Sequence, residues 1–174
     1  PMGAQVGYVA DGIFKSQEEI DNHATQEGAG LGRIRWKDLN GDNKITEADQ
    51  DWIYNPVPDF TYGFNIYLEY KNFDLTAFFQ GVQGVDIISD LKKETDIWAG
   101  LNIGFLNKGK RLLDAWSTTN PNSNIPALSL SDNNNEKRVS SYWVENGSYL
   151  KLRTIQVGYN FPKAIASKLA MQRL

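Results

Sequence analysis

The sequence predicts an all-β fold class, in which a few long strands form a portion of a transmembrane antiparallel β-barrel with long loops. Apolar and polar residues alternate with a period of two over residues 62–70 and 73–80, which is typical of strands with two different faces. Each of these strands spans about 10 residues, whereas globular strands average ~5–6 residues and a bilayer needs ~9–11. The 174 residues contain no apolar run near the ~18 that a helical span requires.

Residues 1–59 are polar and irregular, and we expect a loop region there. Ser16 followed three residues later by Glu19 fits a capping box and predicts a helix of about two turns. Residues 32–37 are a short strand candidate that runs directly into an acidic segment.

Residues 60–84 are predicted to form a β-hairpin with a tight turn at Lys71 and Asn72. Each of its two strands has one apolar face and one mostly polar face. Tyr62 and Tyr70 bracket the apolar face of the first strand, as expected of the aromatic girdles at membrane interfaces.

Residues 85–148 are again loop-like, with a short helix candidate at 110–116. A third long strand is expected from Tyr149 to Phe161, and its alternation changes phase near Thr154, which a β-bulge would reconcile. A short helical turn is possible over 163–172. Three long strands cannot close a sheet, and unpaired apolar edges are intolerable in lipid, so the chain is expected to be part of a larger sheet.

The strongest local motif is the acidic segment 38–49, which fits a twelve-residue calcium loop. Asn43 replaces the usual turn glycine at the sixth position, and Asp replaces the bidentate Glu at the twelfth. We expect a structural Ca²⁺ site of weak affinity, with Kd ~10⁻⁴–10⁻³ M. Its predicted ligands are the side chains of five residues and one backbone carbonyl: Asp38, Asn40, Asp42, the carbonyl of Lys44, Thr46 and Asp49.

Composition argues against several other functions. A net charge of −3 without a basic patch gives no attraction to nucleic acid. The chain has no Cys and a single His, His23, so it offers little for nucleophilic or metal-dependent catalysis. Paired acids such as Glu18 and Glu19 occur by chance in acidic chains. We therefore expect a protein that is not an enzyme and has no catalytic residues.

Seven segments in this order resemble the C-terminal barrel region of SusC/RagA-type TonB-dependent transporters of the Bacteroidetes outer membrane. They are GRIRWKDLNGD at 32–42, NPVPDFTYGF at 55–64, YKNFDLTAFFQGVQG at 70–84, LDAW at 113–116, NPN at 120–122, SYLKLR at 148–153 and GYNFP at 158–162. The resemblance covers most of residues 6–162 and is more specific than any single motif.

The resemblance implies a 22-stranded barrel with a plug, TonB contact through an N-terminal part, and a SusD-like lipoprotein over the extracellular face. It implies import of oligosaccharides or peptides across the bacterial outer membrane. This chain would hold about three strands, with lipid and the remainder of the same barrel and plug as neighbours. Both of its ends are expected to be cut.

Barrels of this kind have short periplasmic turns and long extracellular loops. Residues 1–59 and 85–148 are then extracellular, residues 60–84 are the transmembrane hairpin, and residues 149–174 are a transmembrane strand followed by a periplasmic turn. The loop tryptophans Trp98 and Trp116 are candidates for contact with substrate or with the lipoprotein lid. The alternative hypothesis is a secreted calcium-dependent carbohydrate-binding or dockerin-like module.

Overall fold

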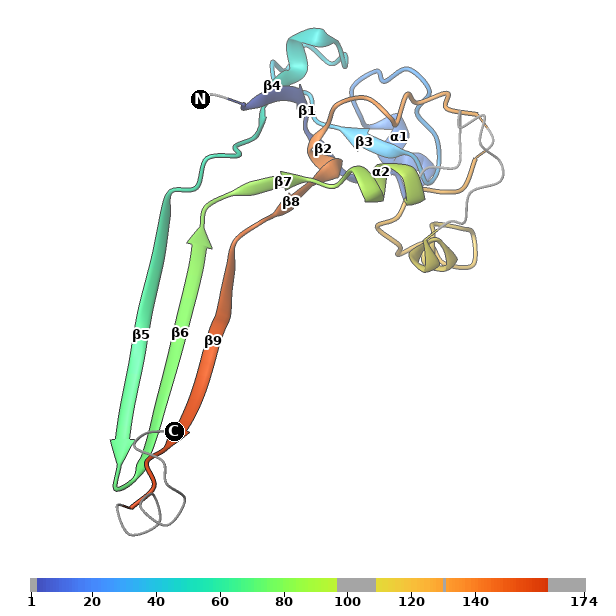
Figure 1. Cartoon of the computed structure of the whole chain (residues 1–174). Coiled ribbons are helices and arrows are strands. Elements are labelled where there is room, and N and C mark those ends of the chain that lie inside the picture. Colours follow the sequence, from blue (N-terminus) through green and yellow to red (C-terminus); the bar gives the residue numbers. More distant parts are fainter. Residues whose placement is uncertain (1–2, 97–108, 130, 163–174) are drawn as a thin grey trace. The chain divides into compact units, whose positions relative to one another are not determined.

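The computed structural model describes residues 3–96, 109–129 and 131–162 (Figure 1). The chain divides into two compact units. Unit 1 comprises Pro1–Pro56 and Asp86–Glu145, and unit 2 comprises Val57–Val85 and Asn146–Leu174. No helix in the described parts of the chain is long and apolar enough to cross a membrane.

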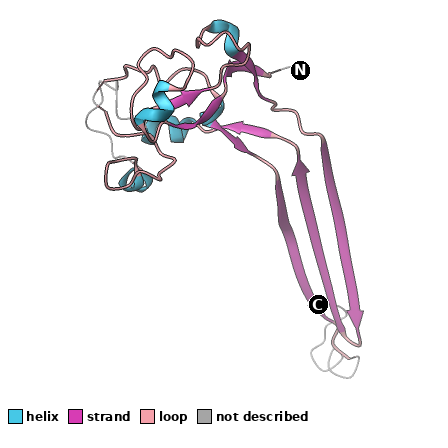
Figure 2. Ribbon diagram, turned by 180° about the vertical axis from the view of Figure 1, so that it is seen from behind, coloured by secondary structure: helices cyan, strands magenta, loops and turns pink. Residues whose placement is uncertain are grey.

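Unit 2 is built on one antiparallel sheet of three long strands (Figures 1 and 2). They are β5 (Phe60–Tyr70), β6 (Phe73–Gln83) and β9 (Tyr149–Tyr159), of 11 residues each, with β6 in the centre. The hairpin prediction is confirmed, since Tyr70 pairs with Phe73 across the turn. Lys71 adopts a φ of 56°, the left-handed conformation that such tight turns require.

The third strand contains the predicted bulge. In the pairing of β6 with β9, Phe78 faces Thr154 but the next residue, Phe79, faces Leu152, so Arg153 is the extra residue. A bulge shifts the side-chain alternation by one residue, which explains the change of phase in the sequence. The strand ends at Tyr159, two residues before the predicted end at Phe161.

The described part of unit 1 contains three two-stranded ladders where the sequence predicted irregular loops, so that prediction was incomplete. The ladders pair β1 (Gln5–Tyr8) with β4 (Gln50–Tyr54), β2 (Ala10–Ile13) with β3 (Ile34–Trp36), and β7 (Asp86–Ile88) with β8 (Val144–Asn146). Strands of three to five residues are too short for a period of two to stand out. The strand candidate at 32–37 is confirmed over residues 34–36.

The helices of unit 1 are also short: α1 (Gln17–Asp21), α2 (Asp90–Asp96), and the 3₁₀ turns η1 (Glu47–Asp49), η2 (Lys110–Asp114) and η3 (Ser141–Trp143). The hydroxyl of Ser16 accepts the Glu19 N–H at 3.2 Å, as the capping box predicted. The Glu19 carboxylate, however, accepts the N–H of Lys15 and not that of Ser16. The helix predicted at 110–116 is a 3₁₀ turn, and the turn predicted at 163–172 lies outside the described residues.

The core of unit 1 forms around β3. Phe14, Ile34 and Trp36 are fully buried, and the Phe14 ring meets the ring of His23 edge-on at 5.1 Å. The Tyr8 and Trp36 rings lie 6.0 Å apart, and the Arg138 guanidinium lies over both. One aromatic cluster therefore joins β1, β3 and the segment after residue 132.

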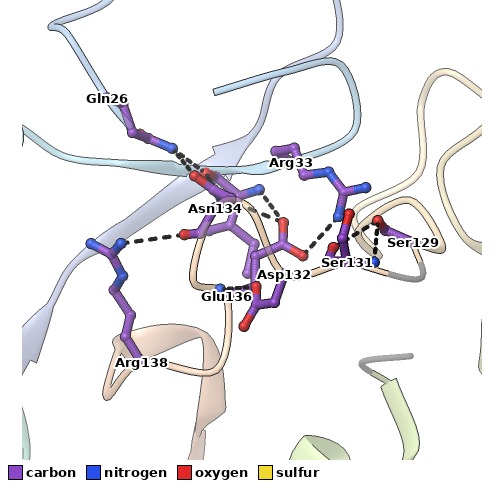
Figure 3. Close-up of polar contacts among 9 residues, drawn as sticks. Gln26, Arg33, Ser129, Ser131, Asp132, Asn134, Glu136 and Arg138 are labelled. Carbon is purple, nitrogen blue, oxygen red and sulfur yellow. Dashed lines mark hydrogen bonds and ion pairs between the residues drawn. The ribbon is translucent and has the colours of Figure 1, made fainter. Parts of the chain in front are cut away.

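One edge of β3 pairs with β2, and side chains provide hydrogen-bond partners for the backbone groups of the other edge. Figure 3 shows the contacts that these side chains make with one another, among them Gln26 with Asn134 and Glu136 with Arg33. The Ile34 N–H donates to Glu136 Oε1 at 3.1 Å, and the Ile34 carbonyl accepts from Gln26 Nε2 at 2.8 Å and Asn134 Nδ2 at 2.9 Å. The Trp36 N–H donates to Gln26 Oε1 at 2.9 Å. These contacts are buried, so each replaces a hydrogen bond that a neighbouring strand would otherwise supply.

Glu136 is the charged member of this group. Burial raises the pKa of its carboxyl, while the hydrogen bond from the Ile34 N–H and the Arg33 guanidinium, 3.1 Å away, oppose that rise. Its own N–H donates to the Asp132 carboxylate. The Asn-rich segment at 132–135 looks like a simple turn in sequence. Its Asn134, together with Glu136 directly after the segment, nevertheless completes a strand pairing about 100 residues away.

Replacing Gln26 by alanine tests this account. Gln26→Ala leaves the Trp36 N–H and the Asn134 side-chain oxygen without these partners, at a cost of about 1–3 kcal/mol for each buried group. Hydrogen exchange of residues 34–36, measured by mass spectrometry on the complete receptor that contains this chain, should become faster accordingly. Gln17→Ala, which removes an exposed glutamine from α1, is the control and should change nothing there. Unchanged exchange in Gln26→Ala would contradict the assigned role.

Candidate functional site

The most extensive candidate surface is the apolar face of the sheet in unit 2. The register aligns side chains in five cross-strand rows on this face: Tyr62–Gly81–Leu150, Phe64–Phe79–Leu152, Ile66–Ala77–Ile155, Leu68–Leu75–Val157 and Tyr70–Phe73–Tyr159. Large side chains in these rows stay exposed, including Leu68 at 58% and Val157 at 73%. An exposed apolar area of this extent marks a surface that contacts lipid or another protein.

Aromatic residues border this face at both ends. Near the hairpin turn, the Phe73 and Tyr159 rings lie 4.7 Å apart, and the Lys71 amine lies over the ring of Tyr70. At the other end, the Phe60 and Tyr62 rings lie 5.7 Å apart. Aliphatic residues fill most of the rows between, so the face has the banded pattern of a strand surface that crosses a bilayer.

The opposite face of the same sheet is more polar. It carries Glu69 and Asp74 directly opposite each other near the turn, and Lys151 and Arg153 farther along β9. Arg153 donates to the side-chain oxygen of Gln80 at 2.9 Å. The two faces differ as the lipid-facing and inward-facing sides of a barrel wall do.

The predicted calcium loop at 38–49 folds through hydrogen bonds to its own backbone. The Asp38 carboxylate accepts the N–H groups of Gly41 at 2.7 Å and Asn43 at 2.9 Å, and Asp42 accepts that of Lys44 at 2.9 Å. Asn43 has a φ of 62°, the conformation that the turn position of such loops requires. The Thr25 N–H donates to the Asn43 carbonyl and ties the loop to the core.

Asp49, the last predicted ligand, is fully buried. Its carboxylate accepts the N–H groups of Leu39 at 3.0 Å, Asn40 at 3.4 Å and Thr46 at 2.7 Å. Burial acts to raise the pKa of Asp49, but these hydrogen bonds outweigh it and lower the pKa below its ordinary value. Asp49 therefore closes the loop as an ionised acceptor, and it also completes a capping box with Thr46.

Within the described residues, no three His, Cys, Asp or Glu side chains gather in an arrangement that could hold a metal ion. The backbone path thus has the turn expected of a calcium loop, while the carboxylates of Asp38, Asp42 and Asp49 bind N–H groups of the loop. The calcium site stays a prediction.

The two predicted tryptophan contacts have different outcomes. Trp98 lies outside the described residues. Trp116 is half-buried, and its indole packs over Gly32 closely enough that a Cβ there would meet the ring. Its role in contacting substrate or a lid stays a prediction.

The sequence interpretation overlooked a hollow beside β4, the Trp52 hollow. It has a volume of about 330 Å³ and is lined by Ala4, Trp52, Ile53, Tyr54, Asn55 and Asp86. Trp52 is 63% exposed. Trp52 lies outside the long alternating strands, so no periodic signal distinguished it from the other loop tryptophans.

The chain is similar in sequence to receptors of Formosa agariphila, although no family model matches it. It is 35% identical over 172 residues to TonB-dependent receptor P3 of Formosa agariphila, which covers 98% of this chain and 16% of that protein. It is 34% identical over 151 residues to TonB-dependent receptor P26 of the same organism, covering 87% and 15%. The chain therefore spans about one sixth of the length of these relatives.

Solved structures share the fold. The structure of the RagAB peptide transporter matches 93% of this chain and 16% of the transporter chain, with a TM-score of 0.67 and 23% identity. The RagAB peptide importer in the open-open state matches 92% and 16%, with a TM-score of 0.64 and 23% identity. Together with the apolar and polar faces of the sheet, the sequence similarities identify the chain as a counterpart of one segment of TonB-dependent receptors, and the solved structures show that it shares the fold of the matching part of the RagAB transporter.

Proposed function

We propose that this chain forms part of the wall and the loops of a TonB-dependent importer in the bacterial outer membrane. The observation that carries the proposal is the exposed apolar face of unit 2, bordered by aromatic side chains at both ends. Exposure of such a face to water is unfavourable, whereas contact with the hydrocarbon of a bilayer stabilises it. The outer edges of β5 and β9 would pair with strands elsewhere in the same receptor.

The names of the relatives support import as the activity of the whole receptor, because they are TonB-dependent receptors and a peptide transporter. On this proposal the chain takes part in binding and transport, not in catalysis. Oligosaccharides or peptides are the proposed cargo, TonB supplies the energy, and a SusD-like lipoprotein covers the extracellular side, where the loops of unit 1 lie. A secreted carbohydrate-binding or dockerin-like module is less consistent with the exposed apolar face.

Substitutions on neighbouring residues test the membrane orientation. Ile66 and Asn65 lie at the middle of β5 and point to opposite faces. Ile66→Arg should destabilise the complete receptor in lipid vesicles by about 2–4 kcal/mol, the cost of a cation at the bilayer midplane. Asn65→Arg, the matched control, should cost much less, because its side chain points to the polar face. Urea unfolding in vesicles measures both, and equal effects would contradict the assigned faces.

Uptake by whole cells tests the import activity. Cells that express the complete receptor should accumulate a labelled oligosaccharide or peptide, and deletion of the receptor or of TonB should abolish accumulation. Extraction of the receptor should require detergent. A protein that stays in the soluble fraction without detergent, with no change in uptake on deletion, would support the secreted-module alternative.

We also propose that loop 38–49 binds a structural Ca²⁺ ion through the six ligands predicted from the sequence. The spacing of Asp38, Asn40 and Asp42 and the left-handed turn at Asn43 support this proposal. Binding would require Asp38, Asp42 and Asp49 to exchange backbone N–H partners for the ion. The three carboxylates among the predicted ligands lie within twelve residues and repel one another, and a cation offsets that repulsion.

Limited proteolysis of the complete receptor tests the calcium site. Millimolar Ca²⁺ should protect residues 33–50, and Asp38→Ala combined with Asp42→Ala should abolish that protection. Asp42→Asn should weaken it while keeping an oxygen for the Lys44 N–H. Glu18→Ala with Asp21→Ala, two exposed acids on α1, is the control. Cleavage that is the same with Ca²⁺ and with chelator in the unaltered receptor would refute the site.

A further inference from the structure

The Trp52 hollow lies at an irregularity of the β1–β4 ladder. Trp52 pairs with Val6 and Tyr54 with Gln5, so Ile53 is an extra residue between them. A bulge of this kind bends the strand and turns side chains out of the regular alternation. Trp52, Tyr54 and Asp86 are among the residues that line this hollow, and Trp52 keeps 63% of its surface exposed.

The carboxylate of this hollow is held in a fixed position. The Asn55 N–H donates to Asp86 Oδ2 at 3.0 Å, and the Asp86 N–H donates to the Asn55 carbonyl at 2.9 Å. No Lys or Arg lines the hollow, and Asp86 has no ion pair within the described parts of the chain. The lining of the hollow therefore includes one acidic residue and an exposed tryptophan, and it contains no Lys or Arg.

We propose that the Trp52 hollow binds the Lys or Arg side chain of a peptide, an assignment that rests on the proposed import function and specifies one cargo class. A cation over an indole face is stabilised by the ring quadrupole, and a fixed carboxylate adds a charged hydrogen bond. Arginine combines both interactions, since its planar guanidinium stacks on aromatic rings and pairs with carboxylates. Anionic ligands would be repelled by Asp86.

The size of the hollow fits this assignment. A volume of about 330 Å³ lies at the lower end of the ~300–1,000 Å³ range of ligand pockets. It has room for one side chain and no room for a folded partner. The charge complementarity favours a cationic side chain over a neutral sugar, which would gain the stacking on Trp52 without the ionic attraction.

Peptide binding to the complete receptor tests the inference. The probes are a fluorescent Gly-Ser-Arg-Ser-Gly peptide and the same peptide with citrulline, a neutral isostere, in place of arginine. The unaltered receptor should bind the arginine peptide about tenfold more tightly, as expected for a cation–π contact with an ion pair. Trp52→Ala and Asp86→Asn should each reduce that preference. Asp86→Asn removes the negative charge but keeps an oxygen that can accept the Asn55 N–H, so its effect on binding reports the charge and not the loss of this hydrogen bond.

Glu27→Gln, which removes an exposed acid distant in sequence from the hollow, should keep the preference. Equal affinity for the two peptides would overturn the inference, and so would a preference for the arginine peptide that survives both Trp52→Ala and Asp86→Asn. The inference would also fail if maltoheptaose competed with the arginine peptide and Trp52→Ala abolished that competition. If cells still import the citrulline peptide in a TonB-dependent way, the import function stands while the cationic site fails. Absence of any TonB-dependent uptake would instead overturn the import function itself.

Discussion

The structure of unit 2 depends on one constraint: one face of its sheet is apolar and needs an apolar environment around it. Its cross-strand rows align aliphatic and aromatic side chains that remain largely exposed within this chain. The stacked rings of Phe64 and Phe79, 4.8 Å apart, show that the rows pack laterally. Lateral packing alone leaves the face open, so its stabilisation must come from an apolar environment. The proposed place in the wall of a membrane barrel would supply that environment, together with partners for the two strand edges.

Unit 1 has a different constraint, because its backbone N–H and C=O groups must find hydrogen-bond partners without long strands. A ladder of two short strands pairs only one edge of each strand with another strand of the ladder. At β3 the remaining edge is paired by Gln26, Asn134 and Glu136, whose side chains supply the donors and acceptors of a missing strand. Long loops rich in Asn, Gln and acidic residues can thus form an ordered core, which explains how unit 1 remains compact with few regular elements.

The candidate site residues were predicted to different extents. The turn at Asn43 followed from the spacing of the acidic loop, because a residue with positive φ is needed there and Asn tolerates it. The sequence did not predict that the Asp49 carboxylate accepts three N–H groups of its own loop. The spacing of residues gives no information on which donors a carboxylate meets. Trp52 was indistinguishable in sequence from Trp116, and their difference in exposure arises from packing against Gly32 and from the bulge at Ile53.

The sequence by itself determined the three long strands, the hairpin turn at Lys71, the bulge near Thr154 and the family resemblance. These features are encoded locally, in a period of two maintained over many residues and in motifs of fixed spacing. Only the tertiary structure decided the short ladders of unit 1, the side-chain pairing of β3 and the Trp52 hollow. The physical reason is that each of these depends on contacts between residues tens to about a hundred positions apart, such as Ile34 with Glu136, and a local pattern does not record which distant groups will meet.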